Sequence, residues 1–446
     1  MLESDWQIHI QQIVRDHQIH TVRMSLNDSS NIARARYIPV QKFLEIGTSG
    51  HISFPSVLFS MDTSQSVQTK VGAGFHGGFP SWEIKPDYST FGSLPYKPGI
   101  ARLIGDLYNG DGTPIETAPR YVLKRVLEEY KKTGYLVYGA FEYEFYAFKE
   151  TENGLEPSWK GLHCFSETKQ SQVEEIFVSL LKGLAEMGAG PEVANTEYGS
   201  GQFEVTHSPF WNLEIADMAF YYRTSIKEIL HDIGYKATFM SKPVNDMSGS
   251  GAHLNLSLHD ENAQNLFSDP SAPDGLSDLC RWFIGGQQLH ARSLCALVNP
   301  TVNSYKRLKP YSFAPSTNTW GYEHRGAMIR IPKSRGVNTR LEHRLPGADT
   351  NPYISLAAIL AAGLDGIRRK IEPAPPLQNQ DAYTSDFEPL PFSLWEALND
   401  LKKDTFLKEI LGDPFMNDYL TLRQAEWDRY RLHVTDWEIK EYLDIF

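Results

Sequence analysis

The stretch Phe141-Glu142-Tyr143-Glu144-Phe145 alternates aromatic and acidic side chains without interruption. Residues two apart in a strand share a face and lie about 6.5–7 Å apart. Glu142 and Glu144 therefore point to one side of the expected strand, and the three aromatic rings point to the other. The pattern predicts a strand with one face packed into an apolar core and a second face that carries paired carboxylates.

Four more segments alternate in the same way and place chemically active side chains on one face. An ordinary antiparallel sheet with one wet face also alternates. Its wet face, however, usually carries Lys, Thr, Ser and Gln. Here the polar faces carry Glu, His and Arg, each backed by apolar residues, which favours a curved sheet or barrel around a polar cavity. The segments are 202–205 with Gln202 and Glu204, 253–258 with His253, Asn255 and Ser257, 340–345 with Arg340, Glu342 and Arg344, and 329–331 with Arg330.

The acids on these faces predict a metal site. Buried carboxylates at this density cannot stay ionised without compensation, and divalent cations and arginines are the natural compensation. About five acids with one His and no Cys suit Mg²⁺ or Mn²⁺ better than Zn²⁺. Two glycine-rich segments support the prediction of a ligand or metal site, because glycine lets a backbone approach a ligand closely. They are EYGSGQFE at 197–204 and SGSG at 248–251, directly before the His253 strand.

The composition bounds the class of protein. The chain has 446 residues, with 43 Lys and Arg against 55 Asp and Glu, so its formal net charge is −12. With 41% hydrophobic and 22% charged residues it can bury a large core, which excludes a disordered, collagen-like or coiled-coil protein. The acidic balance argues against nucleic acid as a partner, because phosphate contacts need clustered Lys and Arg.

The sequence also predicts the cellular compartment of the protein. No stretch reaches the roughly 18 apolar residues that a membrane span needs, and the N-terminus lacks the apolar segment of a signal peptide. Three cysteines without a CxxC pair fit a reducing environment. We therefore expect a cytoplasmic protein with no membrane partner.

The pattern of residue types along the sequence changes near residue 115. We expect an α+β fold with a small N-terminal domain over residues 1–115 and a large catalytic domain over residues 116–446. In the first, a helix over 6–18 and strands at 20–24, 35–39 and 56–61 precede a Gly- and Pro-rich stretch, 72–101, that predicts loops. In the second, we expect an amphipathic helix over 118–132, a surface excursion over 372–392 and a helical tail over 393–446.

Six ordered motifs resemble those of the glutamine synthetase family. They are FEYEF (141–145), EYGSGQFE (197–204), KPVNDMSGSGAHLNLSL (242–258), NPTVNSYKRLKP (299–310), RGAMIRIP (325–332) and RLEHRLPGADTNPYISLAAILAAGLDGI (340–367). The resemblance implies a β-grasp-like N-terminal domain and a catalytic domain built on a curved antiparallel half-barrel flanked by helices. It also implies a ligase that uses ATP to phosphorylate the γ-carboxylate of glutamate, after which an amine attacks the γ-glutamyl phosphate.

The resemblance implies roles residue by residue. Glu144, Glu197 and Glu204 resemble the ligands of one metal, nearer the glutamate. Glu142, His253 and Glu342 resemble those of a second metal, nearer the nucleotide phosphates. Arg307, Arg325 and Arg344 resemble the arginines that bind glutamate and the transferring phosphoryl group. Gly249 resembles the position whose backbone approaches the amino acid substrate. The positions that resemble nucleotide-binding residues are Arg330, Arg340, Ser257 and Asn255. For each metal ligand, a salt-bridged acid is the ordinary alternative.

The sequence departs from ammonia-using members where the nucleophile binds. After YKRL these members carry an acid that attracts ammonium and takes its proton, and Phe313 holds that place here. A phenyl ring accepts no proton and attracts a cation only weakly through its face. Asp62 resembles the acid in the N-terminal domain that helps to bind ammonium, although the residues that usually follow that acid in the family are absent here. Other departures are Asn195 and Thr196 for paired histidines, Asn255 for a second His, and Ser248 for an Asn.

These departures predict a changed amine. We expect an ATP-dependent glutamate–amine ligase whose acceptor is an alkyl or aromatic amine or a polyamine, and Phe313 with Tyr311 favours an amine that has an apolar part. The alternative is an ammonia-using glutamine synthetase, with loop drift letting another acid, such as Glu323, supply the base. A non-catalytic relative is disfavoured because no metal ligand is lost, and a guanidino kinase is disfavoured because the motifs at 299–310 and 340–367 are present. The resemblance further implies a ring-shaped homo-oligomer, typically a dodecamer with sites between subunits, and we expect no nucleotidylation at Tyr383.

Overall fold

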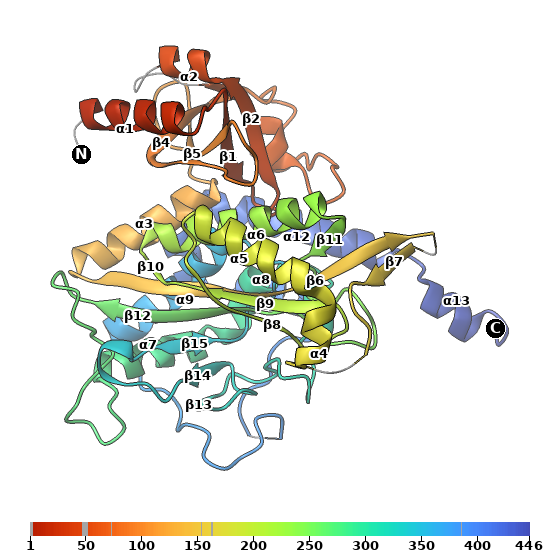
Figure 1. Cartoon of the computed structure of the whole chain (residues 1–446). Coiled ribbons are helices and arrows are strands. Elements are labelled where there is room, and N and C mark those ends of the chain that lie inside the picture. The colour runs from red at the N-terminus through yellow and green to blue at the C-terminus, as the bar shows by residue number, and fades with distance from the viewer. Residues whose placement is uncertain (1–2, 47–51, 73, 153, 162–163, 385) are drawn as a thin grey trace.

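Two β-sheets organise the chain in a computed structural model that describes residues 3–46, 52–72, 74–152, 154–161, 164–384 and 386–446 (Figure 1). The smaller sheet has the order β2-β1-β5-β4-β3, with β1 parallel to β5 and its other neighbours antiparallel. Its inward side chains, such as Val22 and Leu103, are fully buried. The elements are α1 (Glu3–Asp16), β1 (Thr21–Asn27), β2 (Ala33–Pro39), α2 (Val40–Ile46), β3 (Ile52–Pro55), β4 (Ser81–Ser93) and β5 (Ile100–Tyr108).

The larger sheet has ten strands and is centred on the long strand β6. Its main path runs β13-β14-β15-β12-β6-β9-β8, and the short strands β7, β10 and β11 also pair with β6. All its pairs are antiparallel except β13 with β14. The strands are β6 (Leu136–Thr151), β7 (Gly154–Pro157), β8 (Pro191–Thr196), β9 (Gln202–His207), β10 (Phe210–Trp211), β11 (Tyr235–Thr238), β12 (Ala252–His259), β13 (Trp320–Tyr322), β14 (Ile329–Ile331) and β15 (Leu341–His343).

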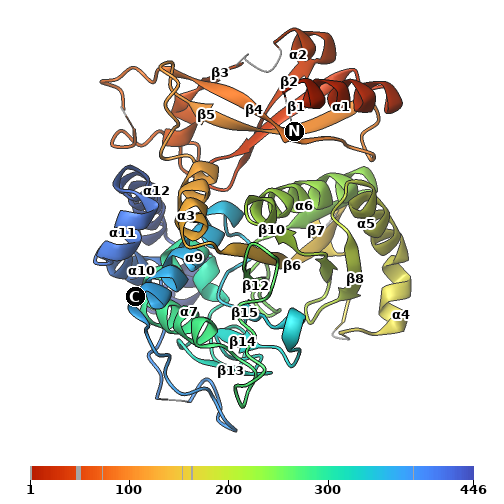
Figure 2. The same ribbon diagram turned by 90° about the vertical axis from the view of Figure 1, so that its left-hand side faces the viewer.

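Helices cover this sheet, so the expected α+β class with a curved, helix-flanked sheet is confirmed (Figures 1 and 2). The most deeply buried helix is α9, whose side chains from Pro352 to Gly366 are all buried. It begins where the Asn351 side chain accepts hydrogen bonds from the amides of Tyr353 and Ile354, with proline in its first turn. The helices are α3 (Pro119–Lys132), α4 (Glu167–Gln170), α5 (Glu174–Glu186), α6 (Leu213–Asp232), α7 (Asp278–Leu289), α8 (Ala291–Val298), α9 (Pro352–Arg369), α10 (Leu394–Leu401), α11 (Thr405–Leu411), α12 (Asp413–Arg431) and α13 (Asp436–Tyr442).

The smaller sheet sits on the helices of the larger unit through a buried ionic network (Figure 2). The Arg120 guanidinium on α3 contacts Asp87 on β4 at 2.7 Å, Asp106 on β5 at 2.9 Å and Asp217 on α6 at 2.7 Å. One cation therefore ties two strands of the small sheet to two helices. The boundary near residue 115 lies between β5 and α3 and stays a prediction.

Two local predictions in the N-terminal part are wrong. The stretch 72–101 was expected to form loops, but it contains β4 and the start of β5. Pro86 and Gly92 are local strand breakers, and the register between β4 and β5 shifts between Asp87 and Gly92. Pairing with β3 and β5 on both sides nevertheless holds the strand, because tertiary contacts override local preference. The expected strand at 56–61 is a 3₁₀ helix over Ser56–Ser60.

The C-terminal tail is helical as expected, and its last helix, α13, projects from the body of the molecule (Figure 1). Trp437 and Leu443 are 61% and 69% exposed, so the apolar side of this helix has little cover within one chain. Among the described residues, no helix is long and apolar enough to cross a membrane.

Candidate active site

The pairing of β6 with its two neighbours gathers the acids of the first motif. On one side, β12 places His253 directly opposite Glu142. On the other side, β9 places Glu204 directly opposite Glu144. The aromatic residues of the same stretch are at most 1% exposed on the other face. The alternation in the sequence therefore becomes a polar wall backed by a packed core.

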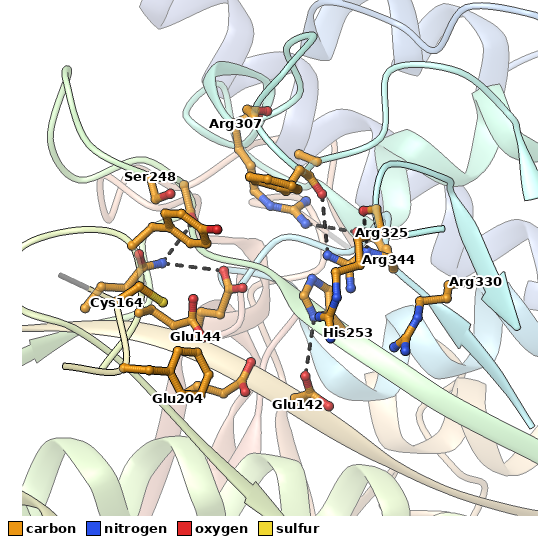
Figure 3. A pocket seen from close by; sticks show the side chains of 18 residues that line it. Glu142, Glu144, Cys164, Glu204, Ser248, His253, Arg307, Arg325, Arg330 and Arg344 are labelled. Atoms are coloured by element: carbon orange, nitrogen blue, oxygen red, sulfur yellow. Dashed lines mark hydrogen bonds and ion pairs between the residues drawn. The ribbon is translucent and has the colours of Figure 1, made fainter. Parts of the chain in front are cut away.

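A cavity of about 570 Å³ opens in front of this wall. In Figure 3 the carboxylates of Glu144 and Glu204 lie on one side of the cavity, Arg325, Arg330 and Arg344 lie on the other, and His253 lies between them. Eleven of the sequence-predicted site residues line it: Glu142, Glu144, Glu197, Glu204, Gly249, His253, Arg307, Phe313, Arg325, Arg330 and Arg344. The cavity is thus a cleft between clustered anions and clustered cations.

Two carboxylates in this cavity, those of Glu197 and Glu204, have a raised pKa. Burial and the neighbouring Glu144 raise the pKa of Glu197 from its ordinary 4.5 to about 7. Burial, with Glu142 and Glu144 close by, raises the pKa of Glu204 well above its usual range. Burial also opposes the charge on Glu142, but the contact with His253 outweighs it and lowers the pKa of Glu142. The cluster holds more negative charge than its protein surroundings neutralise.

Three of these residues meet the geometric requirement of a metal site. Glu142, Glu204 and His253 each offer one ligand atom, and these atoms lie within 4.8 Å of one another. His253 Nδ1 is buried and has no hydrogen-bond partner in the described part of the chain; Glu142 Oε1 and Glu342 Oε1 both lie 3.7 Å away. This imidazole nitrogen has no hydrogen-bond partner among the described residues and is surrounded by carboxylates that repel one another. Such a set of ligands suits a divalent cation that prefers oxygen ligands.

The three-residue strand β15 holds Glu342 between two arginines. Arg330 Nη1 contacts Glu342 Oε2 at 2.6 Å, and Arg344 Nη1 contacts Glu342 Oε1. Burial raises the pKa of Glu342, but Arg344 and His253 outweigh it and keep the pKa below its ordinary value. Glu342 does not itself line the cavity, but it sets the positions of two arginines that do. Arg330 also pairs at 3.1 Å with Glu323, which does not line the cavity either.

Arg307 and Arg325 bring positive charge that no carboxylate in the described part of the chain neutralises directly. Arg307 donates to the carbonyl oxygens of Leu345 at 3.0 Å and Arg344 at 2.9 Å, and burial lowers its pKa to about 10. For Arg325, the described residues place no carboxylate oxygen within 4.0 Å of the guanidinium. Both cations are therefore able to bind an anionic ligand in the cavity.

Gly249 lies where the backbone must approach Arg307 closely. A Cβ atom at this position would lie 2.7 Å from Arg307 Cγ and 2.9 Å from the carbonyl oxygen of Ser241. Neither contact is sterically allowed, so any side chain here would displace the loop or the arginine. The glycine places a bare stretch of backbone beside the cavity.

A second cavity, of about 380 Å³, lies on the other side of Glu142, which lines both. Asn255, Ser257 and Arg340 line the second cavity, whereas Arg330 lines the first. Arg340 Nε donates to Asn255 Oδ1 at 3.1 Å, and Ser257 Oγ lies 2.9 Å from His259 Nε2. The structure thus separates three of the four expected nucleotide residues from the arginine cluster while keeping the two spaces adjacent.

An aromatic wall borders the first cavity. The rings of Phe313 and Tyr198 stack with centroids 5.5 Å apart, and Cys164 and Phe165 line the same space. Phe313 has a positive φ of 58°, which costs a non-glycine residue about 1–2 kcal/mol. Sequence reasoning missed Tyr198 as a lining residue although it follows Glu197 directly. It also missed Cys164 and Phe165, which no local pattern marks.

Asp62 lies outside both cavities of its own chain. Its carboxylate accepts hydrogen bonds from Ser64 and Gln68, at 2.6 Å from the Ser64 hydroxyl, and it pairs with Arg429 on α12. Burial opposes the charge, but the hydrogen bonds of Ser64 prevail and lower the pKa of Asp62. Within one chain, Asp62 is a fully bonded carboxylate at the junction of the N-terminal part with α12.

Comparison with known proteins places this site in a family. The family model for the glutamine synthetase catalytic domain matches residues 116–442. A glutamine synthetase of Thermus thermophilus is 39% identical over 376 residues, covering 81% of this chain and 84% of the relative. A glutamate–isopropylamine ligase of a Pseudomonas species is 31% identical over 450 residues, covering 98% of each. A solved structure described as a GmaS/ADP complex superposes with a TM-score of 0.87 at 30% identity, covering 98% of this chain and 99% of that one. The chain therefore belongs to the glutamine synthetase family of ligases.

Proposed function

We propose that the protein joins the γ-carboxylate of glutamate to an amine with an apolar part, using ATP, and releases a γ-glutamylamide, ADP and phosphate. One observation carries the choice of amine. Segment 309–315, which follows the YKRL motif, contains no acid and presents Phe313 to the cavity, stacked on Tyr198. An apolar wall favours an acceptor that buries a hydrocarbon group against it.

In the first step, glutamate is held on the cationic side of the first cavity. Arg307 and Arg344 receive its carboxylates, and the backbone at Gly249 approaches its α-carbon end. A γ-carboxylate oxygen attacks the γ-phosphorus of ATP, the bond to the bridging oxygen breaks, and ADP leaves with the electron pair. Arg325 stabilises the charge on the transferring phosphoryl group.

Divalent cations fit the acidic side of the same cavity. Glu144, Glu197 and Glu204 would hold one, and Glu142, His253 and Glu342 would hold another. When bound, such cations neutralise nucleotide phosphates and the developing charge. The adjacent cavity, with Asn255, Ser257 and Arg340, accommodates the base and ribose of the nucleotide, and Arg330 faces the phosphates from the first cavity.

In the second step, the amine attacks the acyl carbon of γ-glutamyl phosphate. A C–N bond forms, the C–O bond to phosphate breaks with its electron pair leaving on the phosphate oxygen, and the proton lost by the amine nitrogen passes to the released phosphate. The wall of Tyr198 and Phe313 orients the alkyl or aryl group of the acceptor.

The second candidate is ammonia-dependent glutamine synthesis. It is favoured by the relatives named glutamine synthetase, which include one of Thermotoga maritima that is 35% identical over 97% of this chain. Amine-dependent ADP release, measured with ammonium, methylamine, longer alkylamines, aniline and putrescine, separates the two. The proposal requires kcat/KM for an alkyl or aryl amine to exceed that for ammonium; the reverse order would establish glutamine synthesis instead.

We also propose that the chain assembles into a ring-shaped homo-oligomer, a dodecamer, in which Asp62 serves the site of a neighbouring subunit. The exposed apolar residues of α13 support self-association. Light scattering coupled to size-exclusion chromatography measures the mass of the assembly directly. A monomer at micromolar concentration would contradict the assembly and leave Asp62 without a site.

A further inference from the structure

The carboxylate of Asp349 joins two chain segments that are far apart in the sequence. Asp349 Oδ1 accepts a hydrogen bond from the Ser241 hydroxyl at 2.6 Å. Asp349 Oδ2 accepts from the Thr301 hydroxyl at 2.7 Å and from the Ser304 hydroxyl at 2.8 Å. Asp349 does not line either cavity beside Glu142, so these contacts are not part of a ligand site.

The first segment leads to the glycine beside the cavity. The carbonyl oxygen of Ser241 accepts from the Ser250 amide at 2.8 Å, and the Ser250 carbonyl accepts from the Ala348 amide at 3.0 Å. The Ser241 hydroxyl and the Ser250 backbone are therefore both tied to the segment that carries Asp349. Gly249 lies inside this closed loop.

The second segment leads to the arginine on the cationic side. Thr301 and Ser304 lie in the turn that precedes Arg307, and the Arg307 amide donates to the Ser304 carbonyl at 3.1 Å. The two segments meet where Gly249 and Arg307 come so close that no Cβ fits between them. A shift of either segment would therefore change the position of the Arg307 guanidinium relative to the Gly249 backbone.

Asp349 is itself fixed from the N-terminal part of the chain. The Asn31 side chain donates to the carbonyl oxygens of Asp349 at 2.9 Å and Thr350 at 2.6 Å. In return, the Asn351 side chain donates to the carbonyl oxygen of Asp28 at 2.9 Å. The turn that contains Asp28 and Asn31 thus holds Asp349 and the two residues that follow it.

From these contacts we infer that Asp349 is a positioning residue for the glutamate half of the site. It fixes the distance between the Gly249 loop and Arg307 without touching a substrate, and this role rests on the proposed binding of glutamate there. Removing the carboxylate leaves the Ser241 hydroxyl without its acceptor. Among the residues that the structure describes, the two segments are then joined only at Asn303, whose side chain accepts from the Lys242 amide at 2.8 Å and donates to the Lys242 carbonyl at 2.9 Å, and this remaining link lets them shift relative to each other. A displacement near 1 Å at a binding group can cost about 100-fold in efficiency.

The test compares Asp349→Ala with wild type by calorimetric titration of glutamate in the presence of Mg²⁺ and a non-hydrolysable ATP analogue. We expect the dissociation constant for glutamate to rise at least about 10-fold, while that for the nucleotide analogue changes less than about twofold. Asp349→Asn retains one carbonyl acceptor and should fall between the two. In steady-state assays the loss should appear mainly in KM for glutamate rather than in KM for ATP.

Asp365→Ala is a matched control. Asp365 on α9 is equally polar and 2% exposed, and it accepts from His290 at 3.0 Å and Arg369 at 2.8 Å, but neither it nor its partners line the cavity. It should lower the unfolding temperature and leave glutamate affinity within about twofold. Asp349→Ala should weaken glutamate binding even when its unfolding temperature matches that of the control.

A double-mutant cycle makes the inference sharper. Ser241→Ala should weaken glutamate binding in the wild-type background and have no further effect in Asp349→Ala, because the acceptor of the Ser241 hydroxyl is already gone. Equal effects in both backgrounds, or wild-type glutamate affinity in Asp349→Ala, would overturn the positioning role alone. A wild-type protein that fails to bind glutamate at all would overturn the proposed function, and this role with it.

Discussion

Replacing Glu197 by glutamine should stabilise the metal-free protein, although it removes a residue of the candidate site. Burial and Glu144 raise the pKa of Glu197 to about 7. A group whose pKa is raised on folding costs nothing below its unfolded value and destabilises progressively as the pH rises through its folded value. Each unit between 4.5 and about 7 is worth about 1.4 kcal/mol, so ionised Glu197 costs the folded state about 3 kcal/mol at about pH 8.

Urea unfolding of protein dialysed against chelator measures this cost. From about pH 5 to about pH 8 the wild type should lose stability relative to Glu197→Gln, up to about 3 kcal/mol. The glutamine can still accept the hydrogen bond that Asn195 donates to Glu197 at 3.0 Å, so the local shape is kept. Glu186→Gln, which removes an exposed carboxylate at the end of α5, should stay within about 0.5 kcal/mol of wild type at every pH.

Added Mn²⁺ should narrow the difference in stability between the wild type and the variant. Saturation to about 100 times the dissociation constant stabilises the wild type by about 2.7 kcal/mol, and the variant should gain less because one ligand is lost. If wild type and Glu197→Gln show the same dependence on pH without metal, the carboxylates do not repel one another in the folded protein. The metal argument would then lose its physical basis.

Three further outcomes are expected. Glu204→Gln should abolish turnover and weaken Mn²⁺ binding while circular dichroism stays native, and full activity would remove the metal assignment. Phe313→Glu should raise kcat/KM for ammonium relative to alkylamines, because it restores an acid to an apolar wall; an unchanged ratio would count against the wall as the acceptor site. Arg120→Met should lower the free energy of unfolding by about 3–5 kcal/mol, since three carboxylates lose their shared cation, and a urea midpoint equal to wild type would show that the network contributes nothing.

The strands of the large sheet could be predicted because their signal is local. A period of two in residues 141–145 and 253–258 needs no knowledge of the rest of the chain. The strand β4 could not be predicted, because Pro86 and Gly92 break the local pattern and only β3 and β5 on either side make the strand stable. The same limit applies to Ser56–Ser60, where apolar residues fit a 3₁₀ turn as well as a strand.

The site could be predicted in part for a related reason. Glu142, Glu144, Glu204 and Glu342 were recognisable on their own strands, whereas Glu197 lies in the connection after β8. Motif resemblance supplied the grouping that one strand cannot give. Register then decides which atoms meet: Glu204 comes within ligand distance of Glu142 and His253, across the two expected metal sets. The roles of Cys164 and Asp349 could not be predicted from the sequence. Cys164 lines a cavity and Asp349 hydrogen-bonds three hydroxyl groups only because segments that are distant in the sequence fold together.

The division of labour between strands and loops has a practical consequence for engineering. Glu142, Glu144, Glu204 and Glu342 stand on hydrogen-bonded strands, whereas Tyr198 and Phe313 stand on the connections between them, as do Glu197, Arg307 and Arg325. Connections tolerate replacement far better than paired strands do. A library confined to positions 198 and 313 could therefore retune which nucleophile is accepted while the neighbouring Glu197, Arg307 and Arg325 and the acids on the strands stay unchanged, and natural descendants of this scaffold could diversify by the same route.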